Sequence, residues 1–275
     1  MRVLAASTLV LCGLAAAACG GTANSERVAA PVAAQPSAAE TSAAGAKTLA
    51  AAEVRKKPLS GKTIVIDPGH NGGNYKHPKA INRQVNVLTQ WKACDTTGTS
   101  TNDGYSEAAF TWDVSQRLAK ILKSQGADVK LTRKNNTSVG PCITERAAIG
   151  NKAGADAAIS VHADGSAAAN HGFHVIMPKK INGPVDPVVN DSRRLGLAVR
   201  DGFKKETGLP YSTYIGSKAL SFRNDLGGLN LSTVPKIFVE AGNMRNAGEA
   251  AKFQDPAFRQ RIAQGLADGV QNYLK

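Results

Sequence analysis

Two histidines and two glutamates in this chain carry the side chains that a hydrolytic metal centre needs: His70, Glu107, His162 and Glu240. Two imidazoles and one carboxylate leave the fourth position of a tetrahedral zinc ion open to water. The remaining carboxylate could take a proton from that water and hand it to a leaving amine. Each residue alone has an ordinary alternative, because a histidine after a strand usually serves as a hydrogen-bonded loop residue and a glutamate is commonly solvated. Their joint placement therefore decides the question.

Three of the four residues stand where short apolar runs end. The runs are rich in β-branched or small apolar residues: Thr63–Ile66 before the Asp-Pro-Gly turn to His70, Ala157–Val161 before His162, and Lys236–Val239 before Glu240. Runs of this length and composition, bounded by turn residues, predict buried strands. Both imidazoles and one carboxylate are thus expected at strand ends.

The fourth residue, Glu107, precedes a predicted helix. Phe110, Val114 and Leu118 recur at helical spacing, and the pattern stops at Gly126. Glu107 lies about a turn ahead of this helix, three residues before Phe110 and seven before Val114, so it projects on the inward, apolar face. A carboxylate in this position also meets the favourable end of the helix dipole.

Alternating strands and helices predict an α/β fold, with a twisted, mainly parallel sheet flanked by helices. In such sheets ligands gather at the carboxyl edge of the strands. The first turn of a helix that returns from a strand lies at the same edge. We therefore expect the four residues to converge there and to form a zinc site.

The N-terminal segment 1–19 has the pattern of a secretion signal. Met1-Arg2 is followed by the apolar run Val3–Leu14 and by small residues up to Cys19, and the run is too short for a membrane span. Two outcomes stay open: a soluble exported protein, which is the default, and a lipoprotein with lipid on Cys19. Ala16 stands three positions before that cysteine, where lipoprotein signals prefer leucine. We expect export to the periplasm or cell wall, with membrane contact only if Cys19 is lipidated.

The rest of the chain divides into a tether and one catalytic domain. Residues 20–58 are rich in Ala, Pro, Ser and Thr without a sustained apolar period, which predicts a flexible linker. Residues 59–275 are expected to form the catalytic domain. Asp255-Pro256 is a typical helix start, and an apolar stripe follows it to the chain end: Phe258, Ile262, Leu266 and Val270. We expect a monomer without a separate wall-binding module.

The cysteines predict a disulfide. Four are present, and removal of the signal takes away Cys12 and, depending on processing, Cys19. The remaining pair, Cys94 and Cys142, would be oxidised outside the cytoplasm. Neither lies near a second cysteine or a histidine at zinc-finger spacing, so a structural metal site is not expected.

The formal charge of +13 has two interpretations. A basic surface could bind nucleic acid by releasing counterions, but export argues against that partner. An anionic cell envelope, with stem-peptide carboxylates and polymer phosphates, would be attracted by the same field. A generally basic surface without a specific role is an equal alternative.

Several motifs match one enzyme family. The run 63–73, Thr-Ile-Val-Ile-Asp-Pro-Gly-His-Asn-Gly-Gly, looks like the family's opening strand and first zinc-histidine loop, and 159–164, Ile-Ser-Val-His-Ala-Asp, looks like its second zinc-histidine motif. Leu-Thr-Arg at 131–133 and the spacing of Arg, Asn and Ala-Asp across 146–156 are also similar. From about Gly61 to its end the chain resembles the zinc-dependent N-acetylmuramoyl-L-alanine amidases of the Amidase_3 family.

The resemblance implies a role for each residue of the set. It makes His70, Glu107 and His162 the zinc ligands. The run 238–243, Phe-Val-Glu-Ala-Gly-Asn, aligns with the strand that bears the catalytic glutamate, which gives Glu240 the general acid/base role. The implied reaction cleaves the amide between the lactyl group of N-acetylmuramic acid and the L-alanine of the stem peptide. Peptidoglycan or muramyl-peptide fragments would be the substrate, in wall remodelling, division or recycling.

The chain departs from the family pattern in two places. After Glu240 the family often shows an aromatic residue and then Ser-Asn, whereas this chain has Asn-Met-Arg-Asn at 243–246. A long polar insertion, 76–106, carries Cys94. By hypothesis, a disulfide to Cys142 staples it beside the site and shapes or gates the groove.

The remaining histidines are His77, His171 and His174. His77 lies in the insertion, and the other two flank or enter a predicted strand at 172–177. His174 could face the site, but a structural or solvent-facing role is favoured for it.

Two other functions stay open. One is a zinc peptidase that cuts within the stem peptide, which product masses would distinguish. The other is a non-catalytic envelope protein that binds peptidoglycan through the same groove. The presence of all four residues argues against the second, because a binding module does not need them.

Overall fold

The computed structural model of the chain describes residues 56–275. The signal segment expected at 1–19, with Cys19, lies outside the described residues, as does all of the tether 20–58 except its last three positions. None of the described helices is long and apolar enough to cross a membrane.

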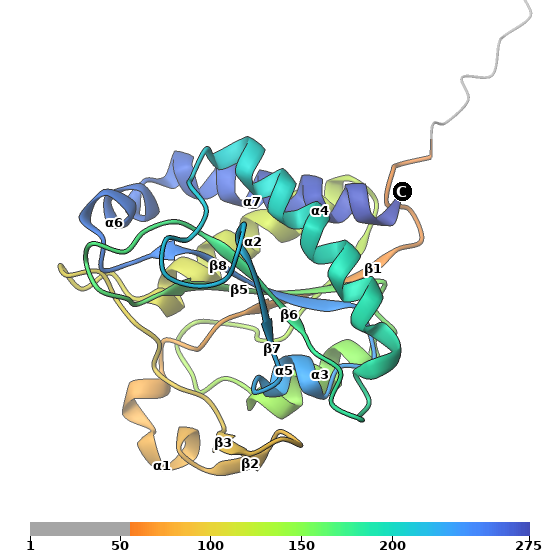
Figure 1. The fold of residues 1–275 in the computed structure, drawn as a ribbon, viewed down its shortest axis with the longest axis horizontal. Helices are drawn as coiled ribbons and strands as arrows, with labels where there is room; N and C mark the ends of the chain where they lie inside the picture. Colours follow the sequence, from red (N-terminus) through yellow and green to blue (C-terminus); the bar gives the residue numbers. More distant parts are fainter. Residues whose placement is uncertain (1–55) are drawn as a thin grey trace, which may run out of the picture. The chain divides into compact units, whose positions relative to one another are not determined.

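A six-stranded sheet forms the centre of this part of the chain (Figure 1). Its order is β4-β1-β5-β8-β6-β7, in which β4, β1, β5 and β8 are parallel, β6 runs antiparallel to β8, and β7 runs parallel to β6. The α/β fold with a mainly parallel sheet is thereby confirmed. The strands are β1 (Thr63–Pro68), β4 (Asp128–Leu131), β5 (Ala157–Asp164), β6 (His174–Pro178), β7 (Leu220–Arg223) and β8 (Lys236–Asn243).

Helices cover both faces of the sheet. Figure 1 shows α2 (Glu107–Ser124), α4 (Val189–Thr207) and α7 (Pro256–Leu274) together on one face, and α3 (Ile143–Lys152) and α5 (Gly227–Asn230) on the other. The main hydrophobic core lies under the first group. Alternate residues of each strand point into it, such as Ile64 and Ile66 of β1, while Val65 between them packs on the opposite face.

The beginnings of α2 and α7, two of the three long helices described, follow from capping side chains. Ser106 accepts a hydrogen bond from the amide of Ala109, so α2 begins at Glu107 itself and not about a turn later, as the apolar pattern suggested. Asp255 likewise accepts a hydrogen bond from the amide of Ala257, and Pro256 occupies the first turn of α7, as predicted. An apolar pattern locates the buried face of a helix but not its first residue, which the cap determines.

The insertion between β1 and α2 contains regular structure. It begins with η1 (Asn74–Lys76) and α1 (Pro78–Ile81) and continues into the antiparallel hairpin of β2 (Gln84–Asn86) and β3 (Trp91–Ala93). The structure joins Cys94, directly after β3, to Cys142 at the start of α3 by a disulfide, the pair predicted from the sequence. The disulfide thus links the end of the hairpin covalently to the start of α3.

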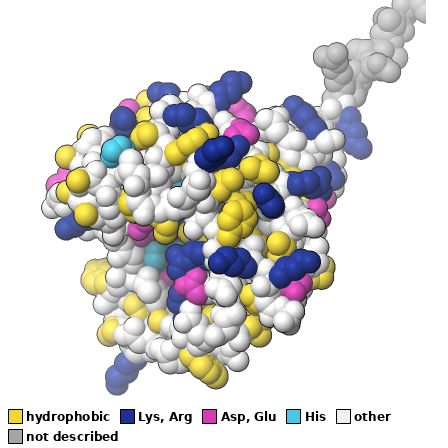
Figure 2. All heavy atoms as spheres, viewed as in Figure 1, with side chains coloured by type: hydrophobic (Ala, Val, Ile, Leu, Met, Phe, Trp, Pro, Cys, Tyr) yellow, Lys and Arg dark blue, Asp and Glu magenta, His cyan; other side chains and the backbone are white. Residues whose placement is uncertain are grey.

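Two short helices complete the fold, η2 (Asp186–Val188) before α4 and α6 (Ala247–Gln254) before α7. Figure 2 shows one face of the surface, where lysine and arginine side chains are scattered among acidic and apolar ones. On this face the positive charge is spread out, without a single large patch.

Candidate active site

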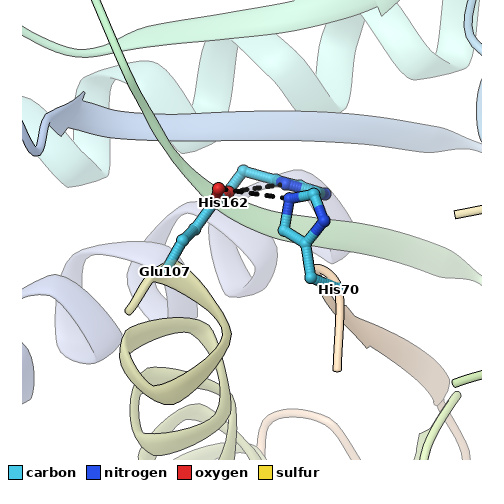
Figure 3. A group of neighbouring side chains, drawn as sticks. All are labelled: His70, Glu107 and His162. Atoms are coloured by element: carbon cyan, nitrogen blue, oxygen red, sulfur yellow. Dashed lines mark hydrogen bonds and ion pairs between the residues drawn. The ribbon is translucent and has the colours of Figure 1, made fainter. Parts of the chain in front are cut away.

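Three of the four predicted residues form one compact group. His70 follows β1, His162 lies near the end of β5, and Glu107 is the first residue of α2. One ligand atom from each lies within 4.8 Å of the others. Figure 3 shows the carboxylate of Glu107 reaching from its helix to both imidazoles, with Oε2 at 3.2 Å from His70 Nε2 and Oε1 at 3.0 Å from His162 Nδ1. Two nitrogens and one carboxylate oxygen are the donor set that suits a zinc ion with an open position.

The charge state of the group follows from this proximity. Burial disfavours the charged forms, but the two imidazoles outweigh burial and lower the pKa of Glu107. Burial also acts against a charged His70, yet the carboxylates of Glu107 and Asp95 raise its pKa to about 10. The raised pKa of His70 favours a proton on its imidazole, at the place where a divalent cation would bind. Ligand groups that attract a proton so strongly also attract a metal ion, and binding one releases the proton.

Two glycines make room for the group. A Cβ atom on Gly69 would lie 2.4 Å from Cε1 of His162, which is closer than real Cβ atoms approach. A Cβ atom on Gly98 would lie 2.7 Å from Oε2 of Glu107 and 2.8 Å from Cδ2 of His70. Gly98 also has a φ of +75°, in the left-handed region that favours glycine. Backbone therefore packs directly against both imidazoles and the carboxylate.

Glu240 lies next to this group but outside it. In the parallel pair of β5 and β8, Glu240 is the register partner of His162, so the two side chains share one face of the sheet. All four residues, His70, Glu107, His162 and Glu240, line one cleft. The Oε2 atom of Glu240 is buried and has no hydrogen-bond partner among the described residues. Burial, followed by the charges of Glu107 and Asp164, raises the pKa of Glu240 well above its usual range.

The two glutamates therefore have opposite electrostatic environments. Glu107 is held ionised between imidazoles, as a ligand must be, while Glu240 gains a proton easily. Pairs of carboxyl groups whose pKa values are pushed apart typically divide into one charged group and one acid/base group. The arrangement can bind a cation and, beside it, accept and return a proton.

Several neighbours of the group could not be identified from the sequence. Phe238 stacks on the ring of His162, with centroids 5.2 Å apart and an interplanar angle of 13°. Oxygen atoms of Asp95 and Thr96 face Nδ1 of His70, the ring nitrogen that points away from Glu107. Motif spacing carries no signal for Asp95 and Thr96, because they reach the site only through the fold. Phe238 alone had a signal, since strand alternation places it two residues before Glu240 on the same face.

The other histidines lie apart from the three-residue group. His77 is exposed, and the Nδ1 atom of His171 lies 3.2 Å from the carbonyl oxygen of Ala169. His174 is buried and is the register partner of Glu240 on β6, so it flanks the glutamate on the side away from His162. Burial, together with the charge of Arg223, lowers the pKa of His174 to about 4. It is a buried neighbour of Glu240, but it is not among the described residues that line the cleft.

Comparisons with known proteins identify the family of the chain. Residues 64–272 match the Amidase_3 family, described as N-acetylmuramoyl-L-alanine amidase. The chain is 37% identical over 234 residues to an N-acetylmuramoyl-L-alanine amidase of Mycobacterium tuberculosis, a match that covers 84% of this chain and 94% of the relative. It is 27% identical to a probable cell wall amidase of Staphylococcus aureus, over 80% of this chain and 60% of that protein.

Solved structures give the same result. The N-acetylmuramyl-L-alanine amidase Ami1 of Mycobacterium smegmatis has a TM-score of 0.74 and 36% identity, covering 78% of this chain and 98% of that one. The apo form of Ami1 from Mycobacterium abscessus has a TM-score of 0.73 and 39% identity, covering 79% and 100%.

Proposed function

We propose that this chain, which belongs to the Amidase_3 family of N-acetylmuramoyl-L-alanine amidases, is a zinc-dependent peptidoglycan hydrolase with zinc ligands His70, Glu107 and His162. Its reaction is the hydrolysis of the amide between the lactyl group of N-acetylmuramic acid and the L-alanine of the stem peptide. Glu240 is the general acid/base. The observation that carries these roles is the single cleft in which a three-ligand donor set lies beside a separate glutamate with a raised pKa.

The roles of the residues follow from their positions. When bound, a zinc ion would supply Lewis-acid activation of the lactyl carbonyl and of a water molecule. Glu240 accepts a proton from that water as the oxygen adds to the carbonyl carbon. The same carboxyl then donates the proton to the amide nitrogen as the carbon–nitrogen bond breaks. A lactyl carboxylate and a peptide with a free L-alanine amine are the products. Phe238 and Gly69 hold the ring of His162 in place for this work.

A defined muramyl-peptide tests the reaction. The zinc-loaded chain, without its first 19 residues, is incubated with N-acetylmuramyl-L-alanyl-D-isoglutamine, and the products are identified by mass spectrometry. We expect the intact lactyl sugar and a dipeptide with a free L-alanine amine, and no product after the metal is removed with a chelator. Cleavage within the peptide would instead support the peptidase. Bound zinc without any cleavage would support the non-catalytic binding protein.

We further propose that the enzyme acts outside the cytoplasm as a monomer, in the periplasm or the cell wall. Hydrolysis of peptidoglycan requires that location, and the expected signal at 1–19 would provide export. Lipid anchoring through Cys19 is tested by detergent partitioning of the wild-type chain and of Cys19→Ser expressed in a bacterial host. Loss of membrane association in the variant would establish the anchor, and identical soluble partitioning of both would exclude it.

A further inference from the structure

The imidazole of His70 has two nitrogens with different surroundings. Nε2 faces Glu107 and the group that would bind the metal. Nδ1 faces three oxygens on the other side of the ring: the carbonyl oxygen of Thr96 at 3.1 Å, its hydroxyl oxygen at 3.1 Å, and Asp95 Oδ1 at 3.5 Å. Carbonyl and carboxylate oxygens accept hydrogen bonds, so they favour a proton on Nδ1. That tautomer leaves the lone pair of Nε2 free for a metal ion.

Asp95 is itself firmly held. It is buried, and its Oδ2 accepts a hydrogen bond from Arg146 Nη2 at 2.9 Å. Its Oδ1, the atom nearest His70, accepts one from the amide of Thr96 at 2.8 Å. The amide of Asp95 donates to the carbonyl oxygen of Ile81 at 3.1 Å. The carboxylate therefore has a fixed position from which to orient the ring.

Arg146 holds the main chain of the same loop. Besides Asp95, it donates to the carbonyl oxygens of Pro68 at 2.7 Å and of His70 at 3.0 Å, and to Asp67 Oδ1 at 2.8 Å. This support matters because His70 has a φ of +59°, in the left-handed region that non-glycine residues adopt at a cost. Arg146 thus fixes the backbone of His70 directly and its ring through Asp95.

The disulfide ties these two partners together. Cys94 immediately precedes Asp95, and Cys142 lies one helical turn before Arg146 on α3. The amide of Ile143 also donates to the carbonyl oxygen of Cys94 at 2.8 Å. A covalent link therefore connects the segment that carries Asp95 to the helix that carries its arginine.

We propose that Asp95 is a positioning residue of the metal ligand His70, and that the Cys94–Cys142 disulfide maintains metal affinity by holding Asp95 against Arg146. The inference rests on the proposed role of His70 as a ligand. Groups that orient a ligating histidine typically contribute about 10- to 100-fold to metal affinity. The insertion between β1 and α2 would then contribute to the metal centre itself, in addition to any effect on the groove.

The first experiment measures zinc affinity by competition with a chromophoric chelator. Asp95→Asn keeps the shape and an oxygen toward Arg146 but removes the charge beside His70. We expect it to bind zinc about 10- to 100-fold more weakly than the wild type. The matched control is Asp113→Asn on α2, because Asp113 also pairs with arginines, Arg117 and Arg259, but is absent from the metal-ligand group. Wild-type affinity in Asp95→Asn would overturn the proposal.

A double-mutant cycle tests the part played by the disulfide. Cys94→Ser with Cys142→Ser should weaken zinc binding when Asp95 is present but add little in the Asp95→Asn background. Additive losses, or no loss from the serine pair, would contradict the coupling. Thermal melting of each metal-free variant shows whether the fold survives. If Asp95→Asn does not fold, Asp95→Glu and Asp95→Ser replace it. Wild-type zinc affinity in Asp95→Glu, together with weaker zinc binding in Asp95→Ser, would support the role of the carboxylate.

The failure of this inference and of the proposed function can be told apart. His70→Ala should abolish zinc binding if His70 is a ligand at all. If His70→Ala binds zinc normally, the metal centre is wrongly assigned. If it loses zinc while Asp95→Asn does not, only the role of Asp95 is wrong.

Discussion

At the scale of single residues, the two glutamates differ because of what surrounds each carboxylate. Glu107 begins a helix and points between two imidazoles, which keep it ionised. Glu240 faces His162 from the next strand, and its buried oxygen has no partner among the described residues. A ligand must be charged, whereas a proton carrier must change its charge during the reaction. These environments explain why two residues of one type can serve two purposes.

This division predicts separable defects. Glu240→Gln should lower the turnover rate by about 10²- to 10⁴-fold, the usual contribution of a general acid/base, because an amide cannot accept the proton of water. Its zinc content, measured by atomic absorption, should match the wild type. His162→Ala should lose zinc and activity together. A fully active Glu240→Gln enzyme would remove Glu240 from the mechanism.

His174 gives a pH-dependent prediction for stability. Its pKa is lowered from 6.5 to about 4 in the folded chain because of burial. Between these two values the unfolded chain binds a proton that the folded chain does not, so stability falls as the pH falls from 6.5 toward 4. The full effect is of order 3 kcal/mol, since one unit of pKa is worth about 1.4 kcal/mol. Urea unfolding between about pH 7 and pH 4 should therefore show a shallower loss for His174→Gln than for the wild type.

His171→Gln serves as the control, because the side chain of His171 is half-exposed whereas that of His174 is buried. We expect the control to follow the wild-type pH dependence. Parallel curves for the wild type and His174→Gln would show that the buried imidazole does not contribute.

Apolar runs and turn residues place local motifs, and they located the segments that carry His70, Glu107, His162 and Glu240. His70 follows β1, Glu107 begins α2 and His162 lies near the end of β5, but β8 runs on to Asn243, so Glu240 lies inside its strand and not at the expected strand end. Asp95, Thr96 and Gly98 could not be found in this way. They lie in an insertion, and their place beside His70 depends on a disulfide, a buried arginine and a hairpin whose register the sequence pattern does not specify.

At the scale of elements, the segment between β3 and α2 packs its backbone against the start of the helix. The amide of Thr99 donates to Glu107 Oε2 at 3.0 Å, and Gly98 leaves no room for a side chain beside Glu107 and His70. The sequence predicted the strands β1, β5 and β8 and the apolar face of α2. It did not predict that β6 and β7 run opposite to the other strands, because apolar periodicity is the same in either direction.

Gly98→Ala should disturb the metal group. The added methyl would lie 2.7 Å from Glu107 Oε2, so the carboxylate or the loop must move. Displacement of a reacting group by about 1 Å costs on the order of 100-fold in activity, and we expect a loss of that size together with weaker zinc binding. Gly104→Ala is the matched control, since Gly104 also has a positive φ, +94°, but no atom lies within 4 Å of the place its added methyl would occupy. Equal effects of the two substitutions would assign the loss to backbone strain alone.

At the scale of the whole described chain, one layer of helices supports the sheet through close backbone contact. The helices α4 and α7 meet at Gly202, Gly265 and Gly269, where a Cβ atom on Gly269 would lie 2.4 Å from the Cα of Val199. Small residues at such a crossing let two helices approach closely. This layer covers the main core, on the face of the sheet opposite the side chains of His162 and Glu240.

Stability and catalysis should therefore be separable at this crossing. Gly269→Ala should lower the free energy of unfolding by about 1–3 kcal/mol, the usual cost of overpacking, with zinc affinity unchanged in the protein that remains folded. Gly150→Ala on α3 is the control, because its added methyl would make an ordinary contact at 3.6 Å. Urea denaturation measures the first quantity, and chelator competition measures the second. A loss of zinc affinity in folded Gly269→Ala would show that the crossing of α4 and α7 is coupled to the metal group.

The position of the oxygen that enters from water tests the central claim most directly. The zinc-loaded enzyme is incubated with N-acetylmuramyl-L-alanyl-D-isoglutamine in ¹⁸O-labelled water, and both products are weighed by mass spectrometry. Hydrolysis at the lactyl carbonyl predicts one ¹⁸O atom in the carboxylate of the sugar fragment and none in the released dipeptide. An ¹⁸O atom in a peptide carboxylate, with the lactyl amide intact, would contradict the account.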